Sequence, residues 1–340
     1  MDSQADADRG SASGALVAVL IPCFNEQPSI GKVVADFRSA LPEAKVFVYD
    51  NGSTDATASV ARRAGAVVRT ERTRGKGNVV RRMFADIEAD VFVLVDGDDT
   101  YDAGAARLLL NKLLSESLDM VQAARVPASD RAYRPGHRFG NRLLTGIVRH
   151  IFGSEVLDML TGYRVFSRRF VKSFPLTSSG FEVETELQIH AFQLRLPTAE
   201  VPVAYRERPE GSASKLHTYS DGLRILRFIV KLLKEEKPLA FFGFIFLLLA
   251  CASVILEIPV IATYLRTGLV PRLPTALLGT GLGILAFLSL TCGLILETVT
   301  RGRVELKRLH YLSTALRFNP VRAVSTPSAP AAAARADDAA

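Results

Sequence analysis

Three carboxylates follow a short apolar stretch in the first third of the chain. Residues 91–95 are continuously apolar, as in a strand that is buried on both faces of a parallel sheet. Asp96, Asp98 and Asp99 come directly after it, and Gly97 between them permits a tight turn. Open α/β sheets bind ligands at the carboxyl ends of their strands, and carboxylates there suit Mg²⁺ or Mn²⁺ on a diphosphate. A solvated acidic turn that caps the next helix would use the same residues.

A second apolar stretch, 16–21, ends in the same way. It runs into Pro22, Phe24 and Glu26. We expect Pro22 to stop strand pairing, because proline has no N–H to donate. The residues after it would open a loop that leads into a helix.

A third stretch, 46–49, runs into Asp50, and Gly52 allows the turn that follows. Capping of the next helix accounts for residues 53–55. It does not account for Asp50, whose carboxylate can accept hydrogen bonds from a base N–H or from ribose hydroxyls. Further on, Lys76 lies between two glycines at a predicted helix start, where backbone N–H groups and the helix dipole favour an anion.

These motifs need a sheet to bring them together. Strand and helix patterns alternate from residue 15 to about 126, which predicts a parallel sheet covered by helices on both faces. Right-handed crossovers then place all the strand ends at one edge. The expected strands cover 16–21, 46–49, 67–68, 91–95 and 201–205, the last at an edge because of Pro202, and the expected helices cover 30–37, 54–64, 77–88, 137–151 and 183–194.

The C-terminal third differs in composition. Apolar residues fill 239–256, with an extension to 264, and 276–296. Each run can cross about 30 Å of hydrocarbon at about 1.5 Å per residue. Basic residues flank both runs, so both outer ends are expected in the cytoplasm, and 218–237 has the pattern of a basic amphipathic helix at the interface. The alternative for the amphipathic segment is a surface helix of a globular domain, and the alternative for the two apolar runs is a pair of buried core helices.

The overall composition indicates which kinds of partner the protein binds. The chain has 340 residues, a net charge of +7 and 48% hydrophobic residues. Its basic residues collect at 125–149, at 206–215 and beside the apolar runs, which favours a membrane surface and anionic substrates over nucleic acid. The three cysteines have no disulfide or zinc spacing. We expect residues 1–14 to be disordered and 301–340 to form a basic and then Ala/Pro-rich cytoplasmic tail.

Taken together, the strand-end motifs resemble family 2 glycosyltransferases with the GT-A fold, over roughly residues 15–217. Two further stretches, Leu160–Arg168 (LTGYRVFSR) and Arg208–Leu216 (RPEGSASKL), resemble polyprenyl-phosphate sugar transferases. That group includes dolichyl-phosphate mannose synthase and the bactoprenol glucosyltransferases, and the latter also carry two C-terminal spans.

The resemblance implies roles for individual residues. Nucleotide-sugar contacts would come from Pro22, Phe24, Glu26, Asp50, Gly52, Lys76, Asp96, Gly97 and Ser214. Asp96 and Asp98 would hold Mg²⁺ or Mn²⁺, and with Arg208 and Lys215 they would form the catalytic set. Arg125, Arg138 and Asn141 would bind the acceptor phosphate. Thr100 stands where some mannose synthases have Gln, so the third metal ligand stays open.

The expected reaction is an inverting, metal-dependent transfer of a hexose to undecaprenyl or dolichyl phosphate at the cytoplasmic face, in a bacterial inner membrane. A UDP-hexose donor is favoured over GDP-mannose. The product would be a lipid-linked sugar for cell-envelope or glycoconjugate synthesis. Glu182 and Glu184 have three possible roles. They could bind sugar hydroxyls, one of them could serve as the base for a hydroxyl acceptor, or they could form a solvated helix start that the helix dipole favours.

The sequence is compatible with two other functions and with either a monomer or a homo-oligomer. One rival is a membrane-bound glycosyltransferase of polysaccharide synthesis, which uses a sugar hydroxyl as acceptor. The other is a catalytically silent membrane scaffold. Gly279, Gly281 and Gly283 permit close helix packing, either within one chain or in a homo-oligomer.

Overall fold

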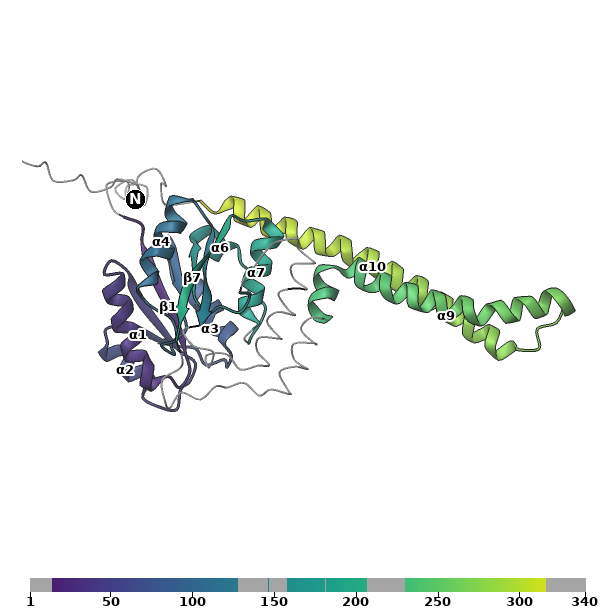
Figure 1. The fold of residues 1–340 in the computed structure, drawn as a ribbon, viewed down its shortest axis with the longest axis horizontal. Helices are drawn as coiled ribbons and strands as arrows, with labels where there is room; N and C mark the ends of the chain where they lie inside the picture. Colours follow the sequence, from purple (N-terminus) through teal and green to yellow (C-terminus); the bar gives the residue numbers. More distant parts are fainter. Residues whose placement is uncertain (1–13, 128–145, 147–157, 181, 207–229, 316–340) are drawn as a thin grey trace, which may run out of the picture.

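The computed structural model describes residues 14–127, 146, 158–180, 182–206 and 230–315. An α/β domain is followed by two long helices that extend away from it (Figure 1). The strands are β1 (Val17–Cys23), β2 (Lys45–Asp50), β3 (Val67–Thr70), β4 (Val91–Leu94), β5 (Met120–Pro127), β6 (Arg164–Ser167) and β7 (Thr198–Tyr205). The helices are α1 (Gln27–Ala40), α2 (Thr57–Arg63), α3 (Lys76–Asp86), α4 (Ala105–Ser115), α6 (Arg168–Ser173), α7 (Val183–Leu194), α9 (Pro238–Thr267) and α10 (Leu273–Ser313).

The seven strands form one mixed sheet in the order β3-β2-β1-β4-β6-β5-β7. The expected β7 edge position is confirmed. The strands expected between residues 15 and 126 (β1, β2, β3 and β4) run parallel, as predicted. The sheet is mixed because β6, which the sequence did not predict, runs antiparallel to both β4 and β5. β6 has only four residues, of which only the middle two, Val165 and Phe166, are apolar, so the sequence does not mark it as a strand.

Helices cover both faces of the sheet. One core contains α1, α2 and α4, and in α1 the predicted stripe Ile30, Val33, Val34 and Phe37 is fully inside it. The other core contains α3, α6 and α7, with aromatic packing around Phe170. Each large side chain buried in this way contributes about 1.5–3 kcal/mol.

Pro22 does not end β1, contrary to expectation. β1 stays paired with β2 as far as Cys23, but it pairs with β4 only as far as Leu20. Leu20 O accepts a hydrogen bond from Val95 N, whereas Cys23 O accepts one from Asn51 N. Alternate residues of a strand bond to opposite neighbours, so Pro22 points its missing N–H toward β4. The proline therefore opens the β1–β4 side of the sheet edge.

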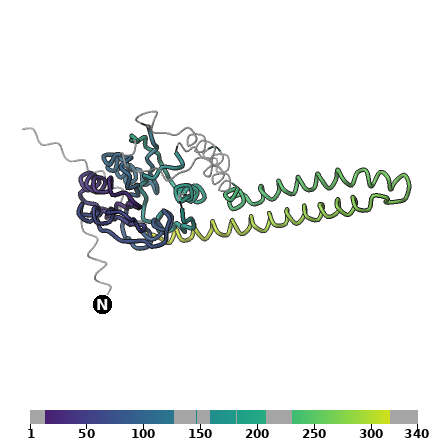
Figure 2. Tube along the Cα trace, turned by 90° about the horizontal axis from the view of Figure 1, so that it is seen from below, coloured from purple at the N-terminus to yellow at the C-terminus, as the bar shows by residue number. Residues whose placement is uncertain are grey.

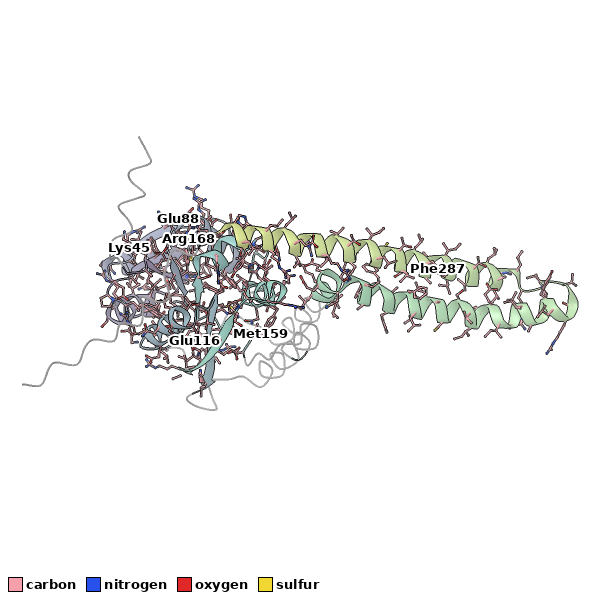
Figure 3. The ribbon with its side chains drawn as sticks, turned by 90° about the horizontal axis from the view of Figure 1, so that it is seen from above. Lys45, Glu88, Glu116, Met159, Arg168 and Phe287 are labelled. Carbon is pink, nitrogen blue, oxygen red and sulfur yellow. The ribbon has the colours of Figure 1, made fainter. Side chains whose placement is uncertain are left out.

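Helices α9 and α10 form a hairpin whose two arms run side by side (Figure 2). Both pass the length and hydropathy criteria for membrane spans. Their large apolar side chains point outward (Figure 3), and Phe287, for example, is 65% exposed. This exposure contradicts the reading of two buried core helices. Ser253 and Ser289 on the inner faces hydrogen bond to backbone carbonyls across the hairpin.

Two of the three glycines that were expected to permit close packing lie at the contact between α9 and α10. A Cβ on Gly279 would lie 2.4 Å from the Glu257 carboxylate, and one on Gly283 would lie 3.2 Å from Ser253. A Cβ on Gly281 would meet nothing within 4 Å. Close packing between α9 and α10 thus accounts for Gly279 and Gly283.

α10 is longer than the apolar run that predicts it. It continues past residue 300 to Ser313, and its last turns lie against α6 and α7 of the α/β domain (Figure 1). In the same region, Glu88 and Arg168 at the domain surface (Figure 3) form an ion pair at 2.6 Å.

Candidate active site

Lys76, the first residue of α3, lies between two carboxylates. Its ammonium is 2.5 Å from Asp96 Oδ1, just beyond β4, and 2.5 Å from Glu184 Oε1 in the first turn of α7. Burial alone would lower the pKa of Lys76, but the two carboxylates outweigh it and raise the pKa above its ordinary value. Lys76 is therefore cationic, and it holds α3, α7 and the end of β4 together.

The other two acids of the cluster have separate environments. Asp98 is buried, and its Oδ1 accepts hydrogen bonds from the Thr100 hydroxyl at 2.7 Å and the Thr100 N–H at 3.3 Å. Asp99 has a left-handed backbone, with φ 58°, and pairs with Lys32 of α1 at 2.7 Å. Thr100 thus orients Asp98, and Asp99 is drawn away from Asp96.

Two glycines allow the chain to approach this cluster closely. A Cβ on Gly97 would lie 2.7 Å from Cys23 Sγ, and one on Gly162 would lie 2.1 Å from Asp96 Oδ2. Gly162 belongs to the 160–168 motif, and its N–H donates to the Tyr101 hydroxyl at 2.9 Å. The motif therefore brings bare backbone against the Asp96 carboxylate.

The carboxylates predicted from three strand ends do gather at one place. Burial raises the pKa of the Cys23 thiol at the end of β1, and Glu26, Asp50, Asp96 and Asp98 each raise it further through their charge. All four acids therefore lie near the same buried sulfur. This is the edge at which open α/β sheets bind ligands.

The loops after β1 and β2 are held together by side chains that sequence reasoning missed. Asn51 donates to the backbone oxygens of Glu71 and Thr73 and accepts from Gly75 N, which fixes the loop before α3. That loop places the Arg74 guanidinium 4.2 Å from the centre of the Phe24 ring. The Asp50 carboxylate, by contrast, accepts only long bonds of 3.2 and 3.3 Å from Ser53 N among the residues that the structure describes.

The expected capping role of residues 53–55 is only partly right. Ser53 Oγ accepts from Asn25 N, and Thr54 N donates to Asn25 Oδ1, so both residues tie the β2 loop to the β1 loop. Asp55 does accept from Thr57 N, the first residue of α2, but it also accepts from Gln27 N at the start of α1. The loop serves two helices, not one.

A buried polar group lies under α7, beside the Lys76 pair. Arg164 is fully buried on β6, and burial lowers the pKa of its guanidinium to about 10. It donates to Met159 O at 2.9 Å, while its Nε and Nη1, Glu184 Oε2 and Gln188 Oε1 have no hydrogen-bond partner in the described part of the chain. Glu184 is thus not a solvated helix start. Only the Glu-x₃-Gln spacing on one helix face hinted at this group.

Arg125, expected at the acceptor phosphate, makes a bidentate pair with Asp158, at 2.6 and 2.8 Å. Its guanidinium also lies 5.4 Å from the Tyr205 ring centre. Arg138, Asn141, Arg208, Ser214 and Lys215 lie outside the described residues. Arg206, the last described residue before Arg208, does lie beside the acidic cluster, because its N–H donates to Thr100 O at 2.8 Å.

The residues fit a divalent cation that is shared with a ligand. No three His, Cys, Asp or Glu side chains converge on one point among the residues with described positions. Asp96 and Asp98 offer hard oxygen atoms, and the Asp96 side chain is 29% exposed. A side chain at Gly162 would collide with Asp96 Oδ2. Mg²⁺ is commonly bound by one or two carboxylates together with substrate phosphates.

Comparison with known proteins decides the family. Residues 18–174 match the model of glycosyl transferase family 2. Glycosyltransferase AglJ of Haloferax volcanii is 36% identical over 233 residues, which cover 67% of this chain and 75% of that protein. The chain is a family 2 glycosyltransferase. As the resemblance predicted, it is an enzyme of the hexosyltransferase type, with the GT-A fold and two apolar helices appended.

Two further matches bear on the ligands of this glycosyltransferase. The dolichyl-phosphate hexose transferase of Haloferax volcanii is 29% identical over 221 residues, 65% of this chain and 95% of that protein. Mycobacterium tuberculosis glucosyl-3-phosphoglycerate synthase, crystallised with Mn²⁺, UDP-glucose and phosphoglyceric acid, superposes with a TM-score of 0.53. It is 27% identical, and the match covers 65% of this chain and 79% of that one.

Proposed function

We propose that this glycosyltransferase transfers a hexose from a nucleotide sugar, UDP-hexose in preference to GDP-mannose, to a polyprenyl phosphate at the cytoplasmic face of a bacterial inner membrane. The observation that carries the proposal is the fusion of the acidic strand-end site to a hairpin whose apolar surface is left uncovered by the part of the chain that the structure describes. A polyprenyl tail stays in the bilayer, so an enzyme that uses its phosphate must work at the surface. The name of the dolichyl-phosphate relative supports the same acceptor.

Donor binding would fall to the ends of β1, β2 and β4. Asp50 would accept from the ribose or base, and Phe24, together with Glu26, would line the nucleotide. Asp96 and Asp98 would hold Mg²⁺ or Mn²⁺, which when bound neutralises charge on the leaving diphosphate. Cocrystallised Mn²⁺ and UDP-glucose in the structural relative support both the metal and UDP.

Catalysis would rest on position and charge. A lipid phosphate is already anionic at neutral pH, so no side chain has to remove a proton from it, and a single in-line displacement would invert the anomeric carbon. Lys215 and Arg208 would close over the donor phosphates, and Arg138 with Asn141 would hold the acceptor phosphate. Arg125 would join them by exchanging its bond to Asp158 for the phosphate.

Glu184 fits a contact to sugar hydroxyls better than the role of a base. It is already engaged by Lys76, and its second oxygen faces the buried region of Arg164 and Gln188. A substrate hydroxyl would have to displace the Lys76 ammonium before it could donate to this oxygen. The lipid-phosphate reading needs no such base, whereas a hydroxyl acceptor would.

The test uses the full-length protein in detergent with Mn²⁺ or Mg²⁺, a short-chain polyprenyl phosphate and radiolabelled UDP- and GDP-sugars. Label that reaches the organic phase, and is lost in Asp98→Asn but kept in Asp99→Asn, would support the proposal. Asp99 is the matched control, because it pairs with Lys32 and Asn tolerates its left-handed backbone. Turnover of the donor with a sugar hydroxyl and none with the lipid would instead establish the polysaccharide-type reaction.

A further inference from the structure

The last turns of α10 bind the α/β domain through a buried carboxylate. Tyr311 donates its hydroxyl to Asp119 Oδ2 at 2.7 Å, and Asp119 is fully buried immediately before β5. Arg169 of α6 donates to both oxygens of Asp119, at 2.6 and 2.9 Å, and its guanidinium stacks 4.8 Å from the Tyr311 ring centre. Asp119 thus joins β5, α6 and α10.

A second set of contacts joins α10 to α7 and to the base of the hairpin. Lys307 donates to Gln193 Oε1 at 2.7 Å, and Gln193 in turn donates to Glu236. Thr300 and Arg303 donate to the backbone oxygen of Glu235, at 3.1 and 3.3 Å. The helical turn 230–236 directly precedes α9, so both arms of the hairpin are fixed to each other at this end.

These contacts use one face of the α10 segment 300–313, which we call the docking segment. Thr300, Lys307 and Tyr311 lie on that face at helical spacing, whereas Leu309 on the opposite face is 63% exposed. The segment starts shortly after the apolar run, which ends at residue 296. From Arg301 to Tyr311 the helix rises about 15 Å at about 1.5 Å per residue, which is the offset between the hairpin's apolar surface and the Asp119 contact.

Helix α7 links the docking segment to the candidate active site. Its first turn carries Glu184, which pairs with Lys76 beside Asp96, and its last turn carries Gln193, which pairs with Lys307. The helix has 12 residues and is packed along most of its length. The Lys307–Gln193 contact therefore fastens the docking segment to the helix that also carries Glu184.

We propose that the docking segment holds the α/β domain at a fixed height and orientation over the membrane, and that Lys307 and Tyr311 are positioning residues for the membrane-embedded acceptor. The height follows from the continuous helix between the apolar run and Tyr311. The orientation follows from two separated attachment points on the α/β domain, Asp119 with Arg169 of α6 and Gln193 of α7, the second of which also binds Glu236 before α9. The effect on the acceptor rests on the proposed function, whereas the effect on height does not.

The test compares the Lys307→Met/Tyr311→Phe double variant with Leu309→Ala, both as full-length proteins in nanodiscs. A dye at Lys45→Cys, in a background with Cys251→Ala and Cys292→Ala, reports the distance from the domain to the bilayer by energy transfer. We expect the double variant to broaden or shift this distance. We also expect it to raise KM for bilayer-embedded polyprenyl phosphate about tenfold, the factor that two lost hydrogen bonds can produce. KM for a short, detergent-soluble prenyl phosphate and donor affinity should stay unchanged, as should every value in Leu309→Ala.

Three results would overturn the inference. They are an unchanged distance in the double variant, an equal loss with both acceptors, and the same changes in Leu309→Ala. Equal loss would indicate a general structural role. If the unmodified enzyme transfers sugar to neither lipid, the proposed function fails, and the distance measurement still decides whether the segment sets the height of the domain.

Discussion

Replacing Lys76 by Met should destabilise the α/β domain by removing the cation between two carboxylates. The Lys76 side chain is 11% exposed, and its partners Asp96 and Glu184 are 29% and 8% exposed. Breaking a fully buried pair costs about 3–5 kcal/mol, and the partial exposure of Asp96 reduces this to about 2–3 kcal/mol. For a domain of this size the midpoint of thermal unfolding should fall by about 5–10 °C.

Lys32→Met is the matched control. Lys32 also contacts two carboxylates, Asp36 and Asp99, but its side chain is 51% exposed. Pairs in water contribute about 0–1 kcal/mol, so the control should shift the midpoint by only a degree or two. The measurement is scanning fluorimetry of the detergent-solubilised protein without donor or metal.

Glu184→Gln in the Lys76→Met background should restore part of the loss, because one of the two unpaired charges is then gone. The expected coupling between the two sites is about 1–2 kcal/mol, within the range found for contacting residues. Additive effects would show that Lys76 does not bridge the two acids. Equal midpoints for Lys76→Met and Lys32→Met would likewise refute the reasoning from burial.

Three further outcomes follow from the same region. Gly162→Ala should abolish donor binding in calorimetry while the domain stays folded, since its Cβ would lie 2.1 Å from Asp96 Oδ2. The control Gly302→Ala, where a Cβ meets nothing within 4 Å, should bind the donor normally. Tyr101→Phe should cost about 1–3 kcal/mol of stability in denaturant titration, because the buried Gly162 N–H loses its acceptor. Burial, with the nearby Lys307 charge, lowers the pKa of His190 to about 3. The unfolded chain therefore binds a proton below about pH 6.5 that the folded domain does not, and stability should fall as pH drops from about 6.5 toward 3, by up to about 1.4 kcal/mol per unit. His190→Gln should flatten that fall in thermal scans between pH 7 and pH 4, and an unchanged slope would contradict the assignment.

The sequence predicted the strands that carry the site because they are short, apolar and followed by polar residues. The apolar stretches behind Asp50 and Asp96 correspond to β2 and β4 within a residue or so, and α7 has the predicted bounds. Strand β6 was missed because Arg164 breaks its pattern, although this arginine turns out to be fully buried.

Contacts between distant residues could not be predicted from a single sequence. Lys76 was expected at a helix start that binds an anion, and it does lie there, but its partner Glu184 is 108 residues further along the chain. Tyr311 and Asp119 are 192 residues apart. Neither pair produces a local pattern in the sequence. The charged residues after residue 300 were interpreted as the start of a cytoplasmic tail, whereas α10 in fact continues through them to Ser313.

The position of β7 has a consequence for the order in which the protein is made. All seven strands of the described sheet are complete at Tyr205, so the sheet and its acidic edge can fold while the hairpin is still being synthesised. The contact of Tyr311 with Asp119 can form only after both apolar helices have left the ribosome. A nascent chain can thus complete its acidic sheet edge first, and the contact that fastens α10 to the α/β domain forms last.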